Sequence, residues 1–455
     1  MNQMVSLNPS TKCKEMFRVR HLFAVLLAVL ASVVGLKHGP TRVDAAWVLL
    51  RGETLLAFQW PSVEILLLFA IGLAGAIWLY QLGDLGYHPD GTRNMKAMAN
   101  DARRRRQRGH LPPVYPNGWW GILESRLLQR GQVKEVVALG EHLAVFRQEN
   151  GTVSVVDAYC PHLGANLGVG GRVVGNCIEC PFHGWRYRGE DGKCMHIPYA
   201  AKVPDVARVK SWTCLECNGS IYIWYHCDGE EPSWTPKLVD EVESGEWTCR
   251  GLSEHFINAH VEEISENGAD IGHLNHLHGP GVTTGNDLRH IWSSFTGFFT
   301  HQWEADWQPF PAPDTQFGTM TVDMDMYLFG YRIPLPSVKA RAIQNGPGVV
   351  YLYIDGPLMH VVLVSSITPV EPLLLRYTQS IYASRGTPTF LAKIVQWGEA
   401  VQLERDVTVW NNKSYPAKPV LVKEDAAIVR HRRWYSQFYS KNSPRFTTQR
   451  TSLDW

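Results

Sequence analysis

Two short segments decide the fold of this 455-residue chain: Cys160-Pro161-His162-Leu163-Gly164-Ala165 and Cys180-Pro181-Phe182-His183-Gly184-Trp185. Each segment supplies one cysteine and one histidine, Cys160 with His162 and Cys180 with His183. Two thiolates and two imidazoles can hold either a zinc ion or a two-iron cluster. A zinc finger separates its cysteine pair from its histidine pair along the chain, whereas here each half carries one of each. The pattern therefore favours a [2Fe–2S] cluster in which the cysteines hold one iron and the histidines hold the other.

The same segments resemble the two ligand boxes of Rieske iron–sulfur domains. Rieske subunits of respiratory complexes typically carry a further cysteine in each box, joined as a disulfide, where this chain has Ala165 and Phe182. The departure favours the oxygenase type of Rieske domain. We expect a small all-β domain over residues 112–235. Strand-like runs at 133–139, 142–147 and 152–158 fit it, with a hairpin turn at Glu149-Asn150-Gly151.

A second cluster of candidate ligands follows about ninety residues downstream of the second box, on a helix predicted over 259–276. Asp270 and His273 are three residues apart and share one helix face, and His276 is three further on. His278 is five residues from His273, about 140° round an ideal helix. Spacing alone therefore favours His276 over His278, unless the helix ends there as Gly279-Pro280 predicts. The alternative is a polar helix C-terminus whose histidines interact with the helix dipole.

The order N-x-x-D-x-x-H-x-x-x-x-H, from Asn267 to His278, resembles the iron motif of Rieske non-haem iron oxygenases. The resemblance implies that His273 and His278 bind a mononuclear iron. It also implies a third ligand from a C-terminal helix, and Asp406 matches that family's D-x-x-x-W pattern within a helix predicted over 388–412. Glu404 and Glu399 are the alternatives, and a surface salt bridge is the other possible role of Asp406.

Asp270 is not expected to bind metal. By the same resemblance it links His273 to His183 of the partner subunit, which implies a homotrimer with electron transfer between subunits. The domain that carries this second site is predicted over 236–455. We expect an α+β fold there, an antiparallel sheet flanked by helices in a helix-grip-like arrangement, with strands such as 320–328 and 361–364. Apolar strands between 320 and 380 are expected to wall a substrate pocket.

The first 111 residues are predicted to form a membrane anchor and a basic linker. The apolar block 63–82 has about the ~20 residues that a bilayer span requires, whereas the block 22–36 is shorter. A cleaved signal peptide is the alternative for the shorter block. The basic run Arg103-Arg104-Arg105-Arg106 places the following domains in the cytosol, with either one span or a helical hairpin. We expect a membrane location, in the endoplasmic reticulum.

Composition narrows the classes of function. The 44 basic and 43 acidic side chains give a net charge of +1, which argues against a nucleic-acid-binding protein. Nine cysteines are too few for a disulfide scaffold, and the lone Cys214-Leu215-Glu216-Cys217 pair cannot complete a zinc site. A mean hydropathy of −0.17 excludes a polytopic membrane protein. No G-x-G-x-x-G and no P-loop is present, so electrons must come from a separate NAD(P)H-dependent reductase.

Taken over residues 112–440, the chain resembles the Neverland family of cholesterol 7-desaturases and, more distantly, the oxygenase components of 3-ketosteroid 9α-hydroxylases. The resemblance implies a Rieske [2Fe–2S] cluster, a mononuclear non-haem Fe(II) and the use of O₂. It implies desaturation of cholesterol at C7–C8 to 7-dehydrocholesterol, in steroid-hormone synthesis of the ecdysteroid type. Hydroxylation of a sterol or other lipophile on the same machinery is the alternative. A pure electron carrier is disfavoured, because the second site would then have no role.

Overall fold

A computed structural model of the chain describes residues 111–289, 297–334, 337–356, 359–416 and 418–445, together with residues 72, 74–75 and 85–87. It divides into two compact units, Met1–Ala70 and Ile71–Trp455, and the described residues belong to the second. Within the described residues, no helix is both long enough and apolar enough to cross a membrane. The predicted spans at 22–36 and 63–82 lie outside the described part of the chain, except for Gly72, Ala74 and Gly75, which are helical.

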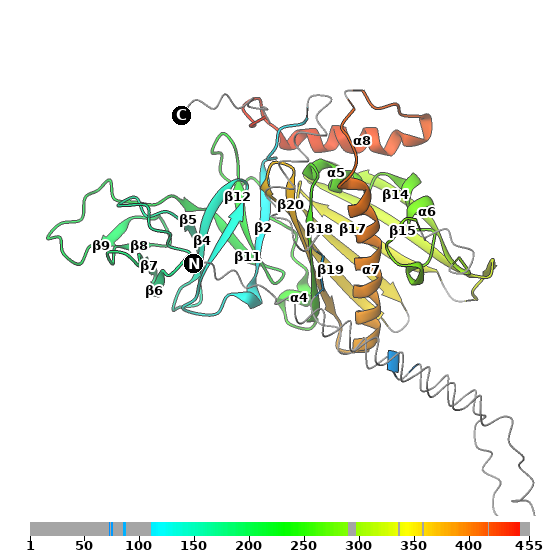
Figure 1. Cartoon of the computed structure of the whole chain (residues 1–455), viewed down its shortest axis with the longest axis horizontal. Coiled ribbons are helices and arrows are strands. Elements are labelled where there is room, and N and C mark those ends of the chain that lie inside the picture. Colours follow the sequence, from blue (N-terminus) through cyan, green and yellow to red (C-terminus); the bar gives the residue numbers. More distant parts are fainter. Residues whose placement is uncertain are drawn as a thin grey trace, which may run out of the picture. The chain divides into compact units, whose positions relative to one another are not determined.

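The Rieske part is built from strands, as the sequence predicts. Residues 118–225 contain three sheets and, besides the strands, one 3-10 helix, η3 (Ser125–Leu127). The predicted strands at 133–139, 142–147 and 152–158 are confirmed by β3, β4 and β5. The sheets, in strand order, are β10–β5–β4–β3, β11–β12–β2 and β6–β7–β8–β9 (Figure 1). Their bounds are β2 Gly118–Glu124, β3 Val133–Ala138, β4 Glu141–Arg147, β5 Val153–Asp157, β6 Arg172–Val174, β7 Cys177–Glu179, β8 Arg186–Arg188, β9 Cys194–His196, β10 Ser211–Trp212, β11 Cys214–Cys217 and β12 Ser220–Tyr225.

The two ligand segments form loops of the same design. In each loop the glycine four residues after the cysteine donates its N–H to the cysteine carbonyl, Gly164 to Cys160 at 2.9 Å and Gly184 to Cys180 at 3.1 Å. Both glycines have positive φ, 72° and 69°, which a side chain would disfavour. Each cysteine N–H in turn donates to the carbonyl of the last residue of its segment, Cys160 to Ala165 at 2.9 Å and Cys180 to Trp185 at 2.8 Å, so each loop closes on itself. A backbone so constrained fixes where each cysteine points before any metal binds.

The catalytic part is a nine-stranded sheet in the order β1–β13–β20–β19–β18–β17–β15–β14, with β16 paired to β15. All neighbours are antiparallel except β1, which is parallel to β13. This confirms the antiparallel sheet, and the predicted strands 320–328 and 361–364 lie within β15 and β19. The bounds are β1 Leu85–Tyr87, β13 Thr248–Ile257, β14 Phe299–Pro309, β15 Phe317–Leu328, β16 Tyr331–Arg332, β17 Val338–Asn345, β18 Val349–Gly356, β19 Met359–Glu371 and β20 Leu374–Ala383.

Helices cover this sheet. The long helix α7 (Thr389–Trp410) packs on β13, β19 and β20, and α8 (Ala426–Tyr435) packs on β14 (Figure 1). The helix predicted over 388–412 is therefore confirmed. The remaining helical elements in the described residues are short: α4 Asp240–Glu243, η4 Val282–Thr284, η5 Lys423–Asp425 and η6 Ser436–Phe438, together with α5 and α6.

The single helix predicted over 259–276 is wrong. The structure has two short helices there, α5 (Val261–Glu266) and α6 (Ile271–Leu277). Asp270 lies between them with ψ at 81°, outside the helical range, and its carboxylate accepts the backbone N–H of His273 at 3.4 Å. Because an N-cap carboxylate satisfies an otherwise free helix N–H, it starts a new helix here. Asp270 therefore caps α6 and does not share a helix face with His273 as the spacing suggested.

Arg376 on β20 joins the Rieske strands to the catalytic sheet. Its guanidinium donates to the backbone carbonyl of Ile122 at 3.1 Å and to the carboxylates of Glu124 at 3.2 Å and Glu254 at 2.5 Å. The Glu124 side chain is only 4% exposed, so this ion pair is largely shielded from water. Burial lowers the pKa of Arg376, but the two carboxylates outweigh it and the net shift is upward. One cation thus neutralises two carboxylates at the junction.

We expect Arg376→Ala to lower the free energy of unfolding by about 3–5 kcal/mol, because it leaves two carboxylates without their cation. Urea unfolding followed by circular dichroism measures the loss. The matched control is Arg332→Ala, which removes an ion pair with Asp325 from an arginine that is 48% exposed. That change should cost little stability, because water screens an exposed ion pair. Equal losses in the two variants would contradict the role given to Arg376.

Candidate metal centre and iron–sulfur loops

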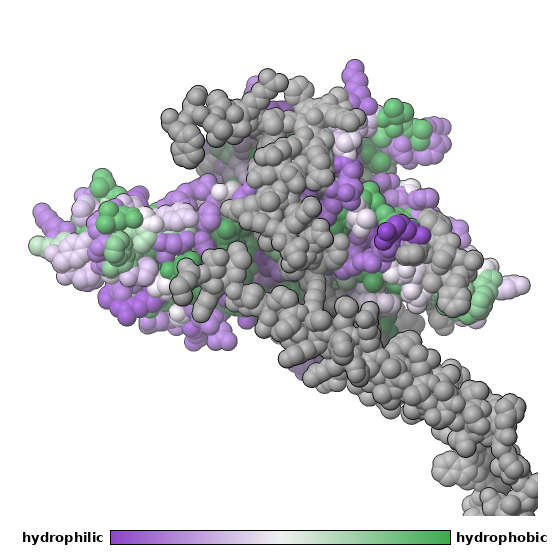
Figure 2. Space-filling view, in the orientation of Figure 1, coloured by the Kyte–Doolittle hydropathy of each residue, from purple (hydrophilic) through white to green (hydrophobic). Residues whose placement is uncertain are grey.

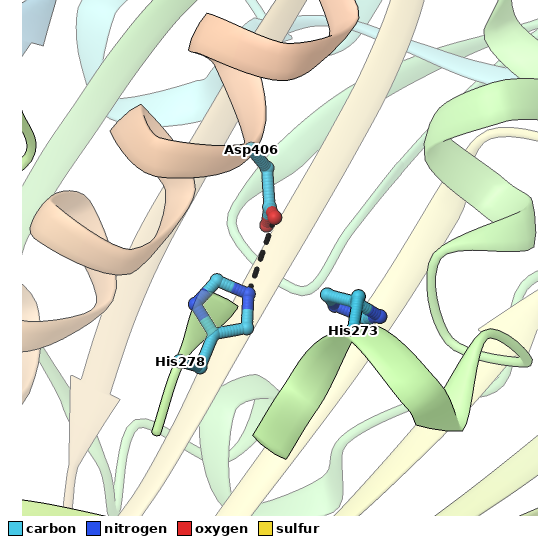
Figure 3. Close-up of side chains that lie close together, drawn as sticks. All are labelled: His273, His278 and Asp406. Atoms are coloured by element: carbon cyan, nitrogen blue, oxygen red, sulfur yellow. Dashed lines mark ion pairs between the residues drawn. The ribbon is translucent and has the colours of Figure 1, made fainter. Parts of the chain in front are cut away.

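Three predicted ligands meet between helices α6 and α7. The ligand atoms of His273, His278 and Asp406 all lie within 4.8 Å of one another (Figure 3). His273 is on α6, His278 is the residue that ends α6, and Asp406 is in the last two turns of α7. His278 Nε2 is 3.2 Å from Asp406 Oδ1, and both side chains are less than a tenth exposed. The structure thus brings these three residues together, and their role as ligands remains a prediction.

The other candidates lie elsewhere. His276 is exposed, because α6 continues through it and turns it away from the cluster, whereas His278 follows the end of the helix. Glu404 accepts a hydrogen bond from Asn286 and lies 3.9 Å from His255 Nε2, so it points to a different side of α7. Glu399 is two turns before Asp406, and burial raises its pKa to about 7. The end of α6 therefore brings His278, and not His276, beside His273 and Asp406.

His273 presents a lone pair to the cluster. Its Nδ1 lies in hydrogen-bond contact with the backbone carbonyl of Asp270, which can only accept, so Nδ1 carries the hydrogen. Its Nε2 is buried and has no hydrogen-bond partner among the described residues. Burial is the largest influence on the pKa of His273 and lowers it, which favours the neutral imidazole. A neutral, buried nitrogen with no donor facing it is suited to bind a metal.

Gln402 and Arg405 set the orientation of His278. Arg405 Nη1 donates to Gln402 Oε1 at 3.0 Å, and because an arginine can only donate, the acceptor must be the amide oxygen. The same oxygen lies 2.7 Å from His278 Nδ1, so that nitrogen must carry a hydrogen. The lone pair of the neutral ring is then on Nε2, which faces Asp406. Burial lowers the pKa of His278, but Asp406 and Gln402 outweigh it and the net shift is upward.

Asp406 is held from its other side. Its Oδ2 accepts from Asn267 Nδ2 at 3.2 Å, and Asn267 lies in the break between α5 and α6. One carboxylate oxygen is thus fixed, and the other faces His278. No sequence pattern predicted these contacts of Asn267, Gln402 or Arg405. For Gln402 a signal exists, since it precedes Asp406 by four residues and so shares its face of α7.

These donors fit a divalent iron. Two neutral imidazoles and one carboxylate form the 2-His-1-carboxylate set of non-haem iron oxygenases. Each histidine also donates a hydrogen bond from its other ring nitrogen, Nδ1, to a carbonyl oxygen, as ligating histidines generally do. The unpartnered Nε2 of His273 is the direct structural sign that a further group belongs here.

The Rieske loops bring the other four predicted ligands together. Cys160 and Cys180 are each 2% exposed, and the rings of His162 and His183 lie 4.7 Å apart. His162 Nδ1 is buried and has no partner in the part of the chain that the structure describes. Burial raises the pKa of the Cys160 thiol, and a hydrogen bond with Tyr187, whose oxygen is 3.0 Å from Sγ, partly offsets this. Two buried thiols opposite two imidazoles fit a [2Fe–2S] cluster.

Two aromatic residues complete these loops. The Trp185 ring stacks on His162 at 4.6 Å, with the planes 8° apart. Tyr187, fully buried, supplies the hydroxyl beside Cys160. Trp185 belongs to the second ligand segment, but the sequence predicted no role for it. Tyr187 belongs to no motif, so the sequence did not indicate it. By contrast, Cys214 and Cys217 lie three apart on β11 and pack into different apolar clusters, so they do not form one site.

Comparison with known proteins agrees with this geometry. The family model of the Rieske [2Fe-2S] domain matches residues 118–212. The family model of the 3-ketosteroid 9alpha-hydroxylase C-terminal domain matches residues 223–439. A cholesterol 7-desaturase of Xenopus laevis is 52% identical over 82% of this chain and 82% of its own length. The oxygenase component of a 3-ketosteroid-9-alpha-monooxygenase from Rhodococcus rhodochrous is 31% identical over 74% of this chain and 84% of its own.

The fold is also that of solved oxygenases. A crystal structure of dicamba monooxygenase superimposes with a TM-score of 0.55, covering 72% of this chain and 98% of the other at 18% identity. Fold and donor sets together define an oxidoreductase of the Rieske oxygenase class, with a [2Fe–2S] cluster and a non-haem iron as its cofactors. Within that class, the chain belongs to the cholesterol 7-desaturase family.

We expect Gln402→Leu to weaken iron binding about 10–100-fold, because loss of the hydrogen bond to a metal-ligating histidine typically costs that much. Titration with Fe(II) against a competing chelator measures the affinity directly. Gln402→Glu keeps an oxygen at the same position and should bind iron nearly as well as the wild type. If both variants lose affinity equally, the hydrogen bond to His278 is not the cause. The electron paramagnetic resonance signal of the Rieske cluster should be unchanged in both.

Proposed function

We propose that this chain desaturates cholesterol at C7–C8 and releases 7-dehydrocholesterol. The observation that carries the proposal is the convergence of His273, His278 and Asp406 in a chain whose relatives, at up to 52% identity, bear the name cholesterol 7-desaturase. Removal of one hydrogen each from C7 and C8 is balanced by O₂, two electrons and two protons, which leave as two molecules of water. The electrons come from a separate NAD(P)H-dependent reductase. The product fits steroid-hormone synthesis of the ecdysteroid type.

The chain's residues divide the work between two sites. Cys160, Cys180, His162 and His183 would hold the Rieske cluster, and His273, His278 and Asp406 would hold the iron. When bound, the cluster supplies single electrons and the iron supplies a place for O₂ beside the substrate. The protein supplies orientation: Asn267 holds one oxygen of Asp406, and Gln402 holds His278.

Apolar side chains exclude water from the neighbourhood of the iron ligands. Leu274 on α6 packs in one cluster with Met320, Val322 and Ala342 from strands β15 and β17, all of them buried. We propose that the apolar faces of β15 to β19 wall the sterol pocket. Apolar walls suit a sterol, which offers one hydroxyl and otherwise only hydrocarbon.

Asp270 is the proposed link for electrons between subunits of a homotrimer. Its side chain is 41% exposed, and its carboxylate Oδ2 lies 3.9 Å from His273 Nδ1, so it could contact both His273 and a neighbouring chain. The Rieske domain exposes an apolar surface that a neighbouring subunit could cover (Figure 2). Its exposed residues are Tyr159, Leu163, Val169, Phe182, Met195, Tyr199 and Val206. Such a patch on a soluble domain generally marks an interaction site. His183 of the partner subunit would then meet Asp270.

We also propose that residues 1–111 anchor the chain in the membrane of the endoplasmic reticulum. The Rieske domain, 112–235, and the catalytic domain, 236–455, then face the cytosol, as the basic run at 103–106 favours. Because a sterol partitions into bilayers, an anchored enzyme and its substrate would encounter each other by lateral diffusion in the same membrane.

A sterol hydroxylase is the second candidate. The match of residues 223–439 to the 3-ketosteroid 9alpha-hydroxylase C-terminal domain, and the 31% identical monooxygenase component, favour it. Both reactions begin by removing a hydrogen from the sterol, so the product alone separates them.

Expression in cells that lack 7-desaturation, fed with cholesterol, tests the proposed function. We expect the conjugated diene of 7-dehydrocholesterol, identified by its ultraviolet spectrum and by mass spectrometry. A hydroxylated sterol in its place would support the hydroxylase. The His273→Ala variant should form no product while its Rieske signal persists. Loss of the Rieske signal together with activity would contradict two separate sites.

Asp270→Asn should retain both metals and yet slow turnover at least about 100-fold, because an amide cannot replace the carboxylate between the two centres. Reduction of the Rieske cluster by the reductase should be normal in this variant, and the defect should appear in the next electron transfer. Stopped-flow absorbance measures both steps. Asp287→Asn is the control, because this exposed carboxylate pairs with Arg289. Near-normal turnover of Asp270→Asn would remove Asp270 from the route.

A further inference from the structure

We propose that one end of the catalytic sheet rests on the lipid bilayer, with an aromatic hairpin tip inserted among the lipid headgroups. The tip consists of Phe298, Leu328, Phe329 and Tyr331. The proposal rests on the membrane anchor of the proposed function, and it adds which face of the catalytic domain touches the membrane.

The tip is apolar, exposed and conformationally costly. Phe329 is 71% exposed and Tyr331 is 80% exposed, with Leu328 at 41% and Phe298 at 39%. Phe329 has φ at 49°, a left-handed conformation that a bulky side chain rarely adopts. Its ring stacks on that of Phe298 at 5.5 Å, and its N–H donates to the Phe298 carbonyl at 2.6 Å. A turn for stability alone would have Asn or Gly at this position.

The tip is directly connected to the candidate iron site. Gly281 donates its N–H to the carbonyl of Phe299, and a side chain on Gly281 would collide with the Phe299 ring. Four residues along β14, Trp303 Nε1 donates to the backbone carbonyl of His278 at 3.0 Å. Four strand residues span about 13 Å. The tip and the segment that carries His278 are therefore parts of one rigid unit.

The register of the sheet shows that the chain arrives at the same end. The pairs Thr248↔Ala383, Ala383↔Val361, Met359↔Gly356, Asp355↔Lys339 and Leu328↔Phe299 mark this end across the strands. Strand β1 is parallel to β13, and its first residue, Leu85, pairs with Ser253. The chain thus enters β1 from the end that carries Thr248. The predicted span 63–82 ends three residues before β1, and on that ground we place this end of the sheet at the bilayer.

Helix α7 distinguishes this end from the opposite one. It begins just after β20, and exposed apolar residues on its first turns, Phe390 and Ile394, lie at the tip end. Gln396 Nε2 donates to the Leu252 carbonyl, and Asn411 Oδ1 accepts from the backbone of Asn258, so α7 runs along β13 away from the tip. Its 22 residues cover roughly 33 Å. Val420 and Val422, also exposed, follow α7 and belong to the far end.

A bilayer suits this surface better than a protein partner. The charges around it nearly balance: Arg332 is paired with Asp325, and Lys339 lies opposite Asp355 on the neighbouring strand, so no strong field selects a protein of opposite charge. Figure 2 shows a small hydrophobic patch where Figure 1 has the end of β15. The tip combines apolar rings with the hydroxyl of Tyr331. Such residues are enriched at the membrane–water interface.

The test compares two ways of delivering the sterol to the full-length protein in lipid vesicles. Phe329→Ser combined with Tyr331→Ser should raise KM for cholesterol embedded in the same vesicles about 5–10-fold. With cholesterol carried by a cyclodextrin in solution, KM should change less than twofold. The matched control is Val420→Ser with Val422→Ser, which removes exposed apolar side chains from the far end and should alter neither value. Equal effects with both deliveries, or none with either, would overturn the proposal.

A second measurement is independent of the substrate. A photoreactive p-benzoylphenylalanine in place of Phe329, in the full chain in phosphatidylcholine vesicles, should crosslink to lipid, and the same residue in place of Val420 should not. Mass spectrometry of the adduct identifies the partner. A protein adduct at position 329 would assign the tip to a second copy or to the reductase, and lipid adducts of equal yield at both positions would also overturn the proposal. If the wild type makes no diene but position 329 crosslinks to lipid, the membrane face stands and the proposed substrate falls.

Discussion

The buried guanidinium of Arg405 is the interaction on which the candidate iron centre depends. It is fully buried and donates to the carbonyls of Leu277, Pro280, Gly281 and Gly285, to the hydroxyl of Thr284, and to Gln402. Burial lowers its pKa to about 10, so it stays charged at neutral pH. Because it accepts nothing and satisfies so many acceptors, it ties the segment after α6 to helix α7. Together with the contact between Gln402 and His278, that tie fixes the separation of His278 from Asp406.

The break between α5 and α6 also helps to position the candidate ligands. A continuous helix over 259–276 would place His278 about 140° from His273. Because Asp270 caps a new helix that ends at Leu277, His278 leaves the helix and turns back to Asp406. The break also frees Asn267 to hold the second oxygen of that carboxylate. Local capping thus sets where α6 begins and ends, and the rings of His273 and His278 lie 5.0 Å apart at the end of that helix.

This explains what the sequence could and could not predict. The ligand types and their spacing, from Cys160 to Asp406, can be read from the sequence, and so can strands β3, β4, β5, β15 and β19, because alternation and turn residues act locally. The helix break was missed because Asn267-Gly268-Ala269-Asp270 is compatible with a helix until the cap forms. Arg405 and Tyr187 were missed for a different reason. Their partners lie far away in sequence, and nothing in a single chain distinguishes a buried arginine or tyrosine from an exposed one.

The cysteines and the histidines of the Rieske site differ in burial, and this difference bears on the path of electron transfer. Cys160 and Cys180 are almost fully buried inside an apolar cluster, whereas His162 and His183 are partly exposed and lie beside the exposed Leu163 and Phe182. The iron held by the histidines would therefore be the one nearer the surface. Charge that enters or leaves has its shortest path through an imidazole edge, and the apolar residues around that edge would exclude water once another surface covers them. The cysteine side of the site is thus shielded from water by the protein itself, and the histidine side is open to a partner surface.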